Sequence, residues 1–145
     1  MKIPTKRFDE SLPLPKYEKQ AAGFDFICRA GATLKPSEIT AIPANLALAI
    51  PEGYVLLIVP RSSTPSSFGL MMPHSVGVLD PYYSGDKNEI VLLLQNFTKK
   101  AVRVKKGDIL AQGILIKYER VEFDEKKKLK SSTRGKWKVP CIRSK

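Results

Sequence analysis

The sequence predicts an all-β protein, and three observations support this prediction. Ten of the eleven prolines lie within the first 81 residues, and proline breaks helix interiors and central strands alike. The segments between the prolines are therefore short, and several of them are apolar runs of strand length. Turn residues separate these runs about every 8–12 residues, which is a spacing typical of a β-sandwich or barrel.

The first expected strands lie between residues 41 and 70. Residues 41–50 (AIPANLALAI) alternate in part between large apolar and small or polar side chains. A turn at 51–53 (PEG) separates them from residues 54–59 (YVLLIV), a continuous apolar run that we expect to be a buried strand. A short helix near residues 65–70 is also compatible with the pattern, because periodicity cannot decide over so short a stretch.

The remaining expected strands lie between residues 90 and 118. Residues 90–94 (IVLLL) form a second buried run, after a stretch rich in Gly, Asp and Asn. Residues 101–104 alternate apolar and basic side chains and lead to a tight turn at 106–108 (KGD). Residues 109–118 then complete the expected set of strands, and we find no internal repeat.

Length and charge indicate one domain with a basic extension. The chain of 145 residues has the size of a single domain. Its net charge is +11, but residues 126–145 hold nine Lys and Arg and no acid, which leaves 16 basic and 14 acidic residues elsewhere. We therefore expect a β domain over residues 1–122 and a basic, flexible arm over residues 123–145. The arm is compatible with a polyanion grip, a solvated terminus, or closure over a phosphate-rich small molecule.

Several classes of protein do not fit the sequence. No apolar stretch approaches the roughly 20 residues that span a bilayer, and the first residues lack the apolar region of a secretory signal. The two cysteines, Cys28 and Cys141, form neither a metal-ligand pair nor a disulfide framework. We therefore expect a cytoplasmic protein in a reducing compartment, with no membrane partner.

Two polar stretches in the first half of the chain are compatible with chemistry. In residues 20–26 (QAAGFDF), small residues allow close backbone approach and Asp25 stands between two aromatics. Taken alone, an aspartate there is most often a turn former or a cap. Residues 60–63 (PRSS) follow the run YVLLIV directly, and Arg61 beside two hydroxyls suits phosphate oxygens. A polar loop with a surface arginine explains this stretch equally well.

Two further stretches lie in the second half. Residues 77–85 (GVLDPYYSG) resemble a hairpin arm in which Asp80 follows an apolar pair. A partly desolvated carboxylate there would be a usable base, and an aromatic three residues later can stack on a ring. A β-turn with core tyrosines is the plainer interpretation. In residues 106–112 (KGDILAQ), Gln112 stands among aliphatic residues and needs polar partners, which structural pairing or a ligand could provide.

Together and in this order, the four stretches resemble the motifs of the trimeric dUTPase family (deoxyuridine triphosphate nucleotidohydrolases). AAGFDF is similar to the first motif, and ALAIPEGYVLLIVPRSS runs into the second. SVGVLDPYYSG is similar to the third motif and KKGDILAQ to the fourth. The resemblance covers about residues 20–118. It implies a distorted β jelly roll and a homotrimer in which each active site takes motifs from neighbouring subunits.

The resemblance also implies a reaction and a cofactor. Family members split dUTP into dUMP and pyrophosphate by attack of water on the α-phosphorus, with Mg²⁺ clamping the triphosphate. Such a reaction depends on positioning and charge neutralisation more than on covalent help. The expected partners are accordingly dUTP, dUMP and two further copies of the chain. A nucleic acid is not expected, because the body lacks the interleaved aromatic and basic residues of base stacking.

Roles for single residues follow from the same resemblance. Asp80 matches the aspartate that orients and deprotonates the water, and Tyr83 matches the tyrosine under the sugar that excludes a 2′-hydroxyl. Asp25 matches the acid that acts on the water shell of the metal. Four side chains would hold the phosphates: Arg61, Ser62, Ser63 and Gln112. Four backbone positions would recognise the uracil edge: Gly77, Val78, Leu79 and Ile90.

Three features depart from the family pattern. His74 stands where some members have an asparagine near the base, and it would either contact the base or be structural. Residues 86–89 (DKNE) are about two residues longer than in many members. The glycine-rich fifth motif is absent, but in residues 131–138 (SSTRGKWK) Arg134 could begin such a motif and Trp137 could supply its aromatic lid.

Two alternative functions remain compatible with the sequence. The related dCTP deaminases need a glutamate on the strand after the third motif, whereas residues 90–94 contain no acid and Glu89 precedes them. The altered fifth motif is also compatible with a dUTPase-fold protein that binds nucleotide or has a regulatory role without catalysis.

Overall fold

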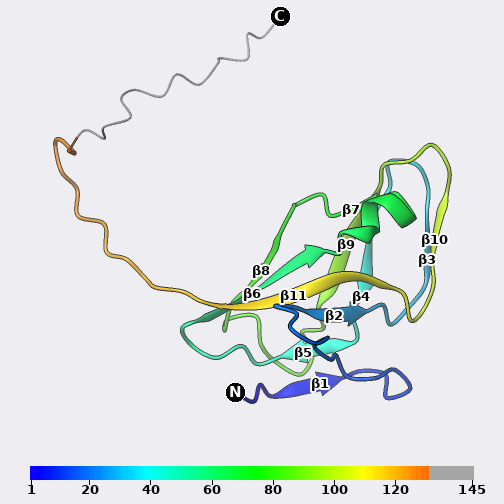
Figure 1. Ribbon diagram of the computed structural model, residues 1–145, viewed down its shortest axis with the longest axis horizontal. Helices are drawn as coiled ribbons and strands as arrows, with labels where there is room; N and C mark the ends of the chain where they lie inside the picture. Colours follow the sequence, from blue (N-terminus) through cyan, green and yellow to red (C-terminus); the bar gives the residue numbers. More distant parts are fainter. Residues whose placement is uncertain (131–145) are drawn as a thin grey trace, which may run out of the picture.

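The computed structural model describes residues 1–130, which form short strands and a single helical turn (Figure 1). The strands are β1 (Thr5–Arg7), β2 (Phe24–Ile27), β3 (Ala32–Leu34), β4 (Ile39–Pro43), β5 (Leu46–Leu48), β6 (Tyr54–Pro60), β7 (Leu70–Met71), β8 (Gly77–Leu79), β9 (Val91–Asn96), β10 (Val102–Val104) and β11 (Ile109–Lys117). One π-helical turn, η1 (Thr64–Phe68), lies between β6 and β7. The prediction of an all-β fold is confirmed.

The largest sheet has the strand order β2-β11-β6-β8, and all its pairs are antiparallel. Its central strand β11 pairs Gln112 with Asp25 of β2 on one side and with Val59 of β6 on the other. At the far side, β8 pairs only with β6, so it forms an edge of this sheet. The backbone groups of β8 that face away from β6 therefore have no strand partner within the described sheets.

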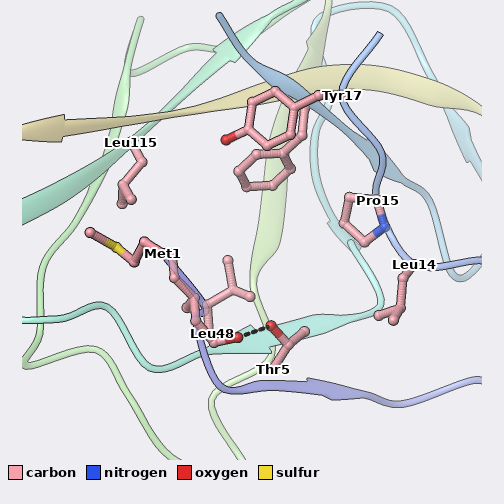
Figure 2. A pocket seen from close by; sticks show the side chains of 9 residues that line it. Met1, Thr5, Leu14, Pro15, Tyr17, Leu48 and Leu115 are labelled. Carbon is pink, nitrogen blue, oxygen red and sulfur yellow. Dashed lines mark hydrogen bonds between the residues drawn. The ribbon is translucent and has the colours of Figure 1, made fainter.

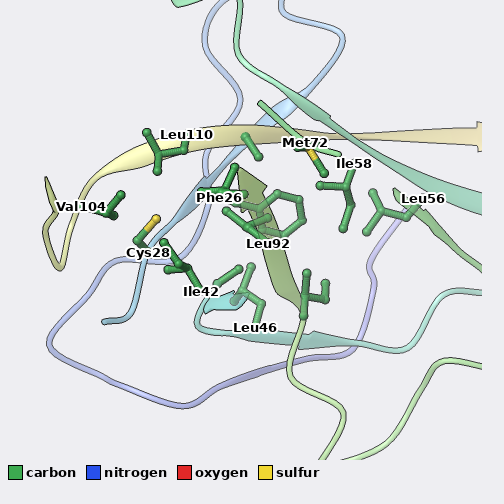
Figure 3. Close-up of a cluster of buried hydrophobic side chains, with 14 of the residues drawn as sticks. Phe26, Cys28, Ile42, Leu46, Leu56, Ile58, Met72, Leu92, Val104 and Leu110 are labelled. Carbon is green, nitrogen blue, oxygen red and sulfur yellow. The ribbon is translucent and has the colours of Figure 1, made fainter. Parts of the chain in front are cut away.

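A second sheet (β4-β9-β7) packs against the first, and two short ribbons, β1-β5 and β10-β3, complete the fold. The side chains between the sheets form one continuous hydrophobic core (Figure 3). Its largest fully buried members include Phe26, Leu56, Leu92 and Leu110. Gly113 of β11 lies in this core, where an added Cβ would come within 2.9 Å of the Phe26 ring.

The structure corrects several details of the sequence prediction. The expected strand 41–50 is divided at Asn45, a buried residue with a φ of 66° between β4 and β5. The run 90–94 is not buried on both faces, because Leu92 and Leu94 point inward while Val91 and Leu93 are 45% and 37% exposed. The stretch 65–70, where the sequence left a short helix open, contains the single turn η1.

Other strands escaped the prediction altogether, namely β1, β2, β3 and β7. The turns were predicted better: Gly53 and Gly107 adopt φ values of 76° and 94°, which only glycine adopts without strain. After β11, the described residues 118–130 form no strand or helix and leave the body in an extended path (Figure 1). No helix within residues 1–130 has the length and apolar composition needed to cross a bilayer.

Candidate active site

A polar cavity of about 240 Å³ lies where β2, β6 and β11 meet, and we call it the strand-end cavity. It brings together residues from three of the four sequence motifs, because β11 pairs with both neighbouring strands. Its lining consists of Lys16, Glu18, Ala21, Gly23, Asp25, Arg61, Ser62 and Gln112. Lys16 and Glu18 were not predicted, since they lie in a charged segment without any recognisable spacing.

Arg61 is fixed at the mouth of this cavity by its position after β6. Its backbone N–H donates to the Leu110 carbonyl at 3.1 Å, and its Nε lies 3.4 Å from Oδ1 of Asp25. Both side chains are partly exposed (42% and 29%), so this ion pair contributes little to stability. A planar guanidinium carries several N–H donors, and it can therefore bind an anionic ligand while it faces Asp25.

Gly23 explains why the first motif needs small residues. An added Cβ at this position would lie 3.0 Å from the Gly113 carbonyl oxygen and 3.1 Å from Oε1 of Gln112. Glycine therefore lets β2 approach β11 closely and leaves room for the Gln112 amide beside the cavity. Gln112 thus lines a polar cavity together with Asp25 and Arg61, which is the kind of environment that its amide was expected to need.

The serines after Arg61 differ in their position. Both are exposed, but Ser62 lines the strand-end cavity, whereas Ser63 is the N-cap of the turn η1. Thr64, which was not predicted, is fully buried and donates its hydroxyl to the Leu110 carbonyl at 2.6 Å. This bond ties the Arg61 loop to β11, and a buried threonine after a run of serines offers little signal in the sequence.

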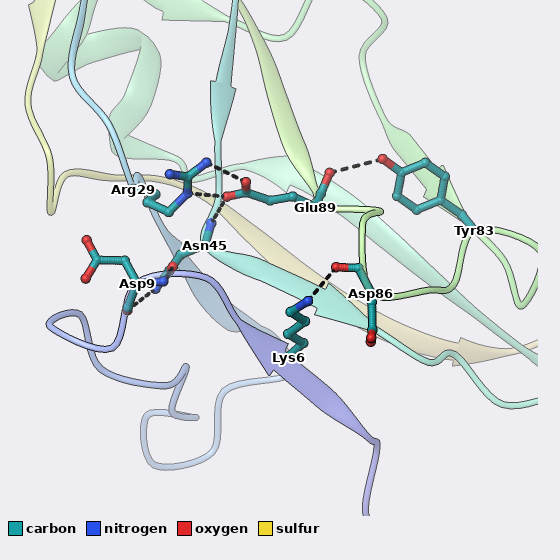
Figure 4. Close-up of polar contacts among 7 residues, drawn as sticks. All are labelled: Lys6, Asp9, Arg29, Asn45, Tyr83, Asp86 and Glu89. Atoms are coloured by element: carbon teal, nitrogen blue, oxygen red, sulfur yellow. Dashed lines mark hydrogen bonds and ion pairs between the residues drawn. The ribbon is translucent and has the colours of Figure 1, made fainter.

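Asp80 and Tyr83 lie on a second structure, which we call the 80–90 loop and which connects β8 to β9. The Asp80 carboxylate accepts a hydrogen bond from the Tyr82 N–H at 3.0 Å, and its carbonyl accepts one from the Tyr83 N–H at 3.1 Å. The Tyr83 hydroxyl donates to the carbonyl of Glu89 at 3.0 Å (Figure 4). Asp80 and Tyr83 are thus neighbours in one turn, and both are exposed in the single chain.

Two of the other cavities in the described part of the chain differ in character. Asp80 lines a polar cavity of about 550 Å³ together with Glu52, Gly53, Pro81, Tyr82, Tyr118 and Arg120. A cavity of about 460 Å³ between the N-terminal segment and β2 is mainly apolar, and its lining includes Met1, Leu14, Tyr17 and Leu115 (Figure 2). None of the predicted site residues lines this apolar cavity.

The expected hairpin has arms in different sheets. Gly77–Leu79 pairs with Leu56–Ile58 of β6, whereas the returning strand β9 pairs with β4 and β7. Ile90, expected to read the uracil edge, is buried, and its N–H donates to Leu46 while its carbonyl accepts from Ala44, both at 2.8 Å. The backbone of Ile90 is therefore already paired within the protein.

The edge strand β8 keeps backbone groups available, as the prediction for residues 77–79 requires. Val78 is 66% exposed on this strand, and Gly77 is buried against Ile58 of β6. His74 is exposed, and its Nε2 would lie 3.6 Å from a Cβ added at Gly77. The imidazole thus stands beside the start of the edge strand, where both a base contact and a structural role remain compatible with its position.

Within one chain, the two groups of site residues lie at opposite ends of β6. Leu79 pairs with Leu56, so Asp80 lies opposite Val55, whereas Arg61 follows the last residue of β6. Six residues of extended strand correspond to a separation of about 20 Å. This separation is too large for Asp80 and Arg61 of the same chain to act on one phosphorus atom. The predicted residues Arg134 and Trp137 lie outside the described residues.

The donors of the strand-end cavity are compatible with Mg²⁺. Asp25, Ser62 and Gln112 offer carboxylate, hydroxyl and amide oxygens, and Mg²⁺ prefers oxygen ligands. Within residues 1–130 no group of three His, Cys, Asp or Glu side chains could hold a metal. Mg²⁺ is commonly bound by one or two carboxylates together with substrate phosphates, so the single Asp25 carboxylate fits such a site.

Fold and motifs together define an all-β protein with a polar site built at the ends of paired strands. Comparison with known proteins identifies the family: the family model described as dUTPase matches residues 10–140. The chain belongs to the dUTPase family. The predicted family and its jelly-roll fold are therefore confirmed.

Curated relatives agree over most of the chain. A deoxyuridine 5′-triphosphate nucleotidohydrolase of Finegoldia magna is 37% identical over 126 residues, with 85% of this chain and 86% of the relative covered. One of Dictyoglomus turgidum is 33% identical over 140 residues, with 93% of both chains covered.

Solved structures show the same fold. The dUTPase of Streptococcus mutans matches with a TM-score of 0.76 and 28% identity, covering 82% of this chain and 98% of that one. The dUTPase of Staphylococcus bacteriophage 80alpha with dUPNHPP has a TM-score of 0.82 at 22% identity, covering 95% and 96% of the two chains. At this identity the phage likeness concerns the fold alone.

Proposed function

We propose that this protein hydrolyses dUTP to dUMP and pyrophosphate. The observation that carries the proposal is the convergence of Asp25, Arg61, Ser62 and Gln112 in one small polar cavity. These residues come from three separate motifs, and their donors and acceptors suit a charged phosphate chain. Relatives that are 33% and 37% identical to this chain over the aligned residues are named deoxyuridine 5′-triphosphate nucleotidohydrolases.

In this proposal the strand-end cavity holds the triphosphate. The Arg61 guanidinium neutralises phosphate charge, while Ser62 and the Gln112 amide orient the phosphate oxygens. Ser63 contributes from the exposed start of η1, beside the cavity. Bound Mg²⁺ would neutralise the charge of the phosphates and of the leaving pyrophosphate, and Asp25 would hold it through water. A few side chains and the bound metal would thereby neutralise the negative charge of the triphosphate, which the hydrolysis of phosphate esters and anhydrides requires.

Asp80 is the proposed general base. A water molecule attacks the α-phosphorus, its proton passes to the Asp80 carboxylate, and the bond from the α-phosphorus to the bridging oxygen of pyrophosphate breaks. General base catalysis of this kind contributes about 10²–10⁴-fold to the rate. The carboxylate is exposed in the single chain, contrary to the desolvation expected from its apolar neighbours. Desolvation would accompany closure of the site around the substrate.

Substrate selection is assigned to β8 and Tyr83. Free backbone groups of Gly77, Val78 and Leu79 on the edge strand would pair with the uracil edge, as an added strand pairs with a sheet. The backbone of Ile90 takes no part, because it is paired with Leu46 and Ala44. The Tyr83 ring would pack under the deoxyribose and leave no room for a 2′-hydroxyl. Hydrogen-bonded recognition of this kind rejects wrong bases more strongly than apolar fit does.

The complete site would be formed between copies of the chain. Asp80 and Arg61 lie about 20 Å apart along β6, so the Asp80 of one copy has to meet the strand-end cavity of another. The second sheet offers a surface for such an association, because it exposes apolar side chains from β4, β7 and β9: Ile39, Met71, Val91 and Leu93. A homotrimer with three equivalent interfaces is the proposed assembly.

Deaminase chemistry is disfavoured by the position of Glu89. Its carboxylate accepts hydrogen bonds from Arg29 and from the backbone N–H of Asn45, and it therefore acts as a structural group. The non-catalytic alternative remains a defined outcome of the experiment below. No observation in residues 1–130 favours either alternative over hydrolysis.

One assay tests the proposal directly. Purified protein is incubated with Mg²⁺ and, separately, with dUTP, dCTP, dTTP and UTP, and the release of pyrophosphate and ammonia is measured. The expected result is pyrophosphate from dUTP alone. Ammonia from dCTP would identify a deaminase, and nucleotide binding without turnover would identify a binding protein. Asp80→Asn should abolish turnover and largely preserve dUTP affinity, so turnover in this variant would refute the assignment of the base.

The basic C-terminal arm is assigned to the closure of the site. We base this on the nine basic residues of 126–145 and on the predicted Arg134 and Trp137, which would meet the phosphates and cover the base. Deletion of residues 126–145 should lower kcat/KM for dUTP. An unchanged kcat/KM would show that the arm does not close on the substrate.

A further inference from the structure

Glu89 is the centre of a polar network that the proposed reaction does not use (Figure 4). Its carboxylate accepts two hydrogen bonds from Arg29, from Nε at 2.8 Å and from the terminal nitrogen at 2.6 Å. A third hydrogen bond comes from the backbone N–H of Asn45 at 2.9 Å. Such a forked arginine–carboxylate pair is geometrically specific as well as strong.

The network is shielded and firmly tied to the body of the protein. The Glu89 side chain is only 12% exposed, and Asn45 is buried. Asn45 in turn accepts the Asp9 N–H through Oδ1 at 2.7 Å and donates through Nδ2 to the Asp9 carbonyl at 3.1 Å. The hydrogen bonds to Glu89 raise the pKa of Arg29 above its already high value, so the guanidinium keeps its charge. The Glu89 side chain is therefore held at a fixed place.

The same residue also holds the tyrosine assigned to the sugar. The carbonyl of Glu89 accepts the Tyr83 hydroxyl at 3.0 Å, across the 80–90 loop. This carbonyl is anchored from two directions. On one side the Glu89 side chain is held by its hydrogen bonds, and on the other side the N–H of the next residue, Ile90, donates to the Leu46 carbonyl. Tyr83 is 40% exposed, and the hydrogen bond of its hydroxyl to the Glu89 carbonyl fixes the phenol end of the ring.

We propose that Glu89 is a positioning residue for sugar discrimination: the Arg29–Glu89 clamp fixes the carbonyl that holds the Tyr83 ring against a 2′-hydroxyl. The inference rests on the proposed function, since it assumes that Tyr83 lies under the sugar. Glu89 lies at the end of the 80–90 loop, directly before Ile90.

The consequence is a defect in selectivity more than in rate. A ring held in one place excludes the 2′-hydroxyl of UTP by contact, whereas a ring that can move aside admits it. dUTP has no 2′-hydroxyl that the ring would exclude, so its turnover should change less than that of UTP. The measured quantity is therefore the ratio of kcat/KM for dUTP to kcat/KM for UTP, which a general loss of stability does not alter.

The experiment compares three variants of the full-length protein with one control. Glu89→Ala and Arg29→Met each break the clamp, and Tyr83→Phe removes the hydroxyl while leaving the clamp intact. Each should lower the selectivity ratio about tenfold, since one orienting hydrogen bond is lost. Lys106→Gln is the control, because Lys106 pairs with Asp9 at 2.6 Å in the same network but does not contact the loop. Its ratio should stay within about twofold of the unmodified protein.

The combination of variants completes the test. Because Glu89 and Tyr83 act through one hydrogen bond, the variant with both Tyr83→Phe and Glu89→Ala should be no less selective than either alone. Unchanged ratios in Glu89→Ala and Arg29→Met would overturn the inference. If these two do not fold, Glu89→Gln and Tyr83→Phe decide, and an unchanged ratio in Tyr83→Phe overturns it as well. Lack of dUTP turnover by the unmodified protein would refute the proposed function itself, which is a distinguishable result.

Discussion

Two inactive variants should restore each other's activity when they are mixed. Asp80→Asn removes the proposed base, and Arg61→Ala removes the main phosphate contact. Each variant alone should be inactive or nearly so. Because the two residues lie about 20 Å apart along β6 of one chain, the proposed mechanism requires that every site combine Asp80 of one copy with Arg61 of another.

The size of the effect follows from that geometry. In an equal mixture that assembles at random, a site is intact only if its Asp80 comes from an Arg61→Ala chain and its Arg61 from an Asp80→Asn chain. About one quarter of the sites satisfy both conditions. The variants are unfolded together in denaturant, refolded at equal concentration, and assayed for pyrophosphate release from dUTP with Mg²⁺. About a quarter of the activity of the refolded unmodified protein is expected.

A matched control distinguishes shared sites from sites within one chain. A chain that carries both substitutions is mixed in equal amount with the unmodified chain and refolded in the same way. Shared sites then retain about one quarter of full activity, whereas sites within single chains retain about one half. No recovery in the first mixture together with one half in the second would refute the shared site.

Three further predictions follow from single positions. Gly23→Ala should raise KM for dUTP about tenfold, because the new Cβ displaces the Gln112 amide; an unchanged KM would separate Gln112 from phosphate binding. Gly113→Ala should lower the free energy of unfolding by about 1–3 kcal/mol in urea titrations, since its Cβ would meet the Phe26 ring; equal stability would show that the core can relax there. Cys28 is fully buried, and burial, followed by the charge of Asp108, raises its pKa to about 12. Native protein should therefore resist alkylation at Cys28 by iodoacetamide while denatured protein reacts, and the folded state should lose stability as the pH rises above about 9, where only the unfolded thiol ionises.

The sequence predicted best what depends on continuous apolar runs and on turns. Residues 54–59 lie in β6 because no helix of useful length fits between Pro51 and Pro60. Glycine fixes the turns at residues 53 and 107. Strand β1 was missed because Thr5–Arg7 is polar and exposed. It is a strand only because β5 supplies its hydrogen-bond partners, and such pairing between distant segments leaves no local pattern.

In the candidate site, too, the sequence predicted the local motifs but not the contacts that depend on tertiary pairing. Asp25, Arg61 and Gln112 were predicted as separate motifs, and their convergence depends on the pairing of β11 with both β2 and β6. Ile90 was assigned to the base from its place near the hairpin, but tertiary hydrogen bonds already occupy its backbone. Glu89 was noticed only as an acid outside the strand. Its role as a clamp became visible when the fold brought Arg29, 60 residues away in the chain, to within 2.6 Å.

Two independent observations are both explained by association with a second copy of the chain. Residues 90–94 are only partly buried, and the proposed site residues Asp80 and Arg61 lie far apart in one chain. A continuous apolar run is typical of a strand buried on both faces, yet the single chain buries Ile90, Leu92 and Leu94 and leaves Val91 and Leu93 partly in solvent. The proposed mechanism meanwhile requires that Asp80 approach an Arg61 that its own chain holds too far away. The burial of Val91 and Leu93 and the approach of Asp80 to Arg61 are separate requirements. A change of side-chain rotamer within one chain satisfies neither of them. A second copy packed against the β4-β9-β7 sheet would bury the exposed apolar side chains. The same association would bring Asp80 to Arg61 only if it places the 80–90 loop at the strand-end cavity of the neighbouring copy.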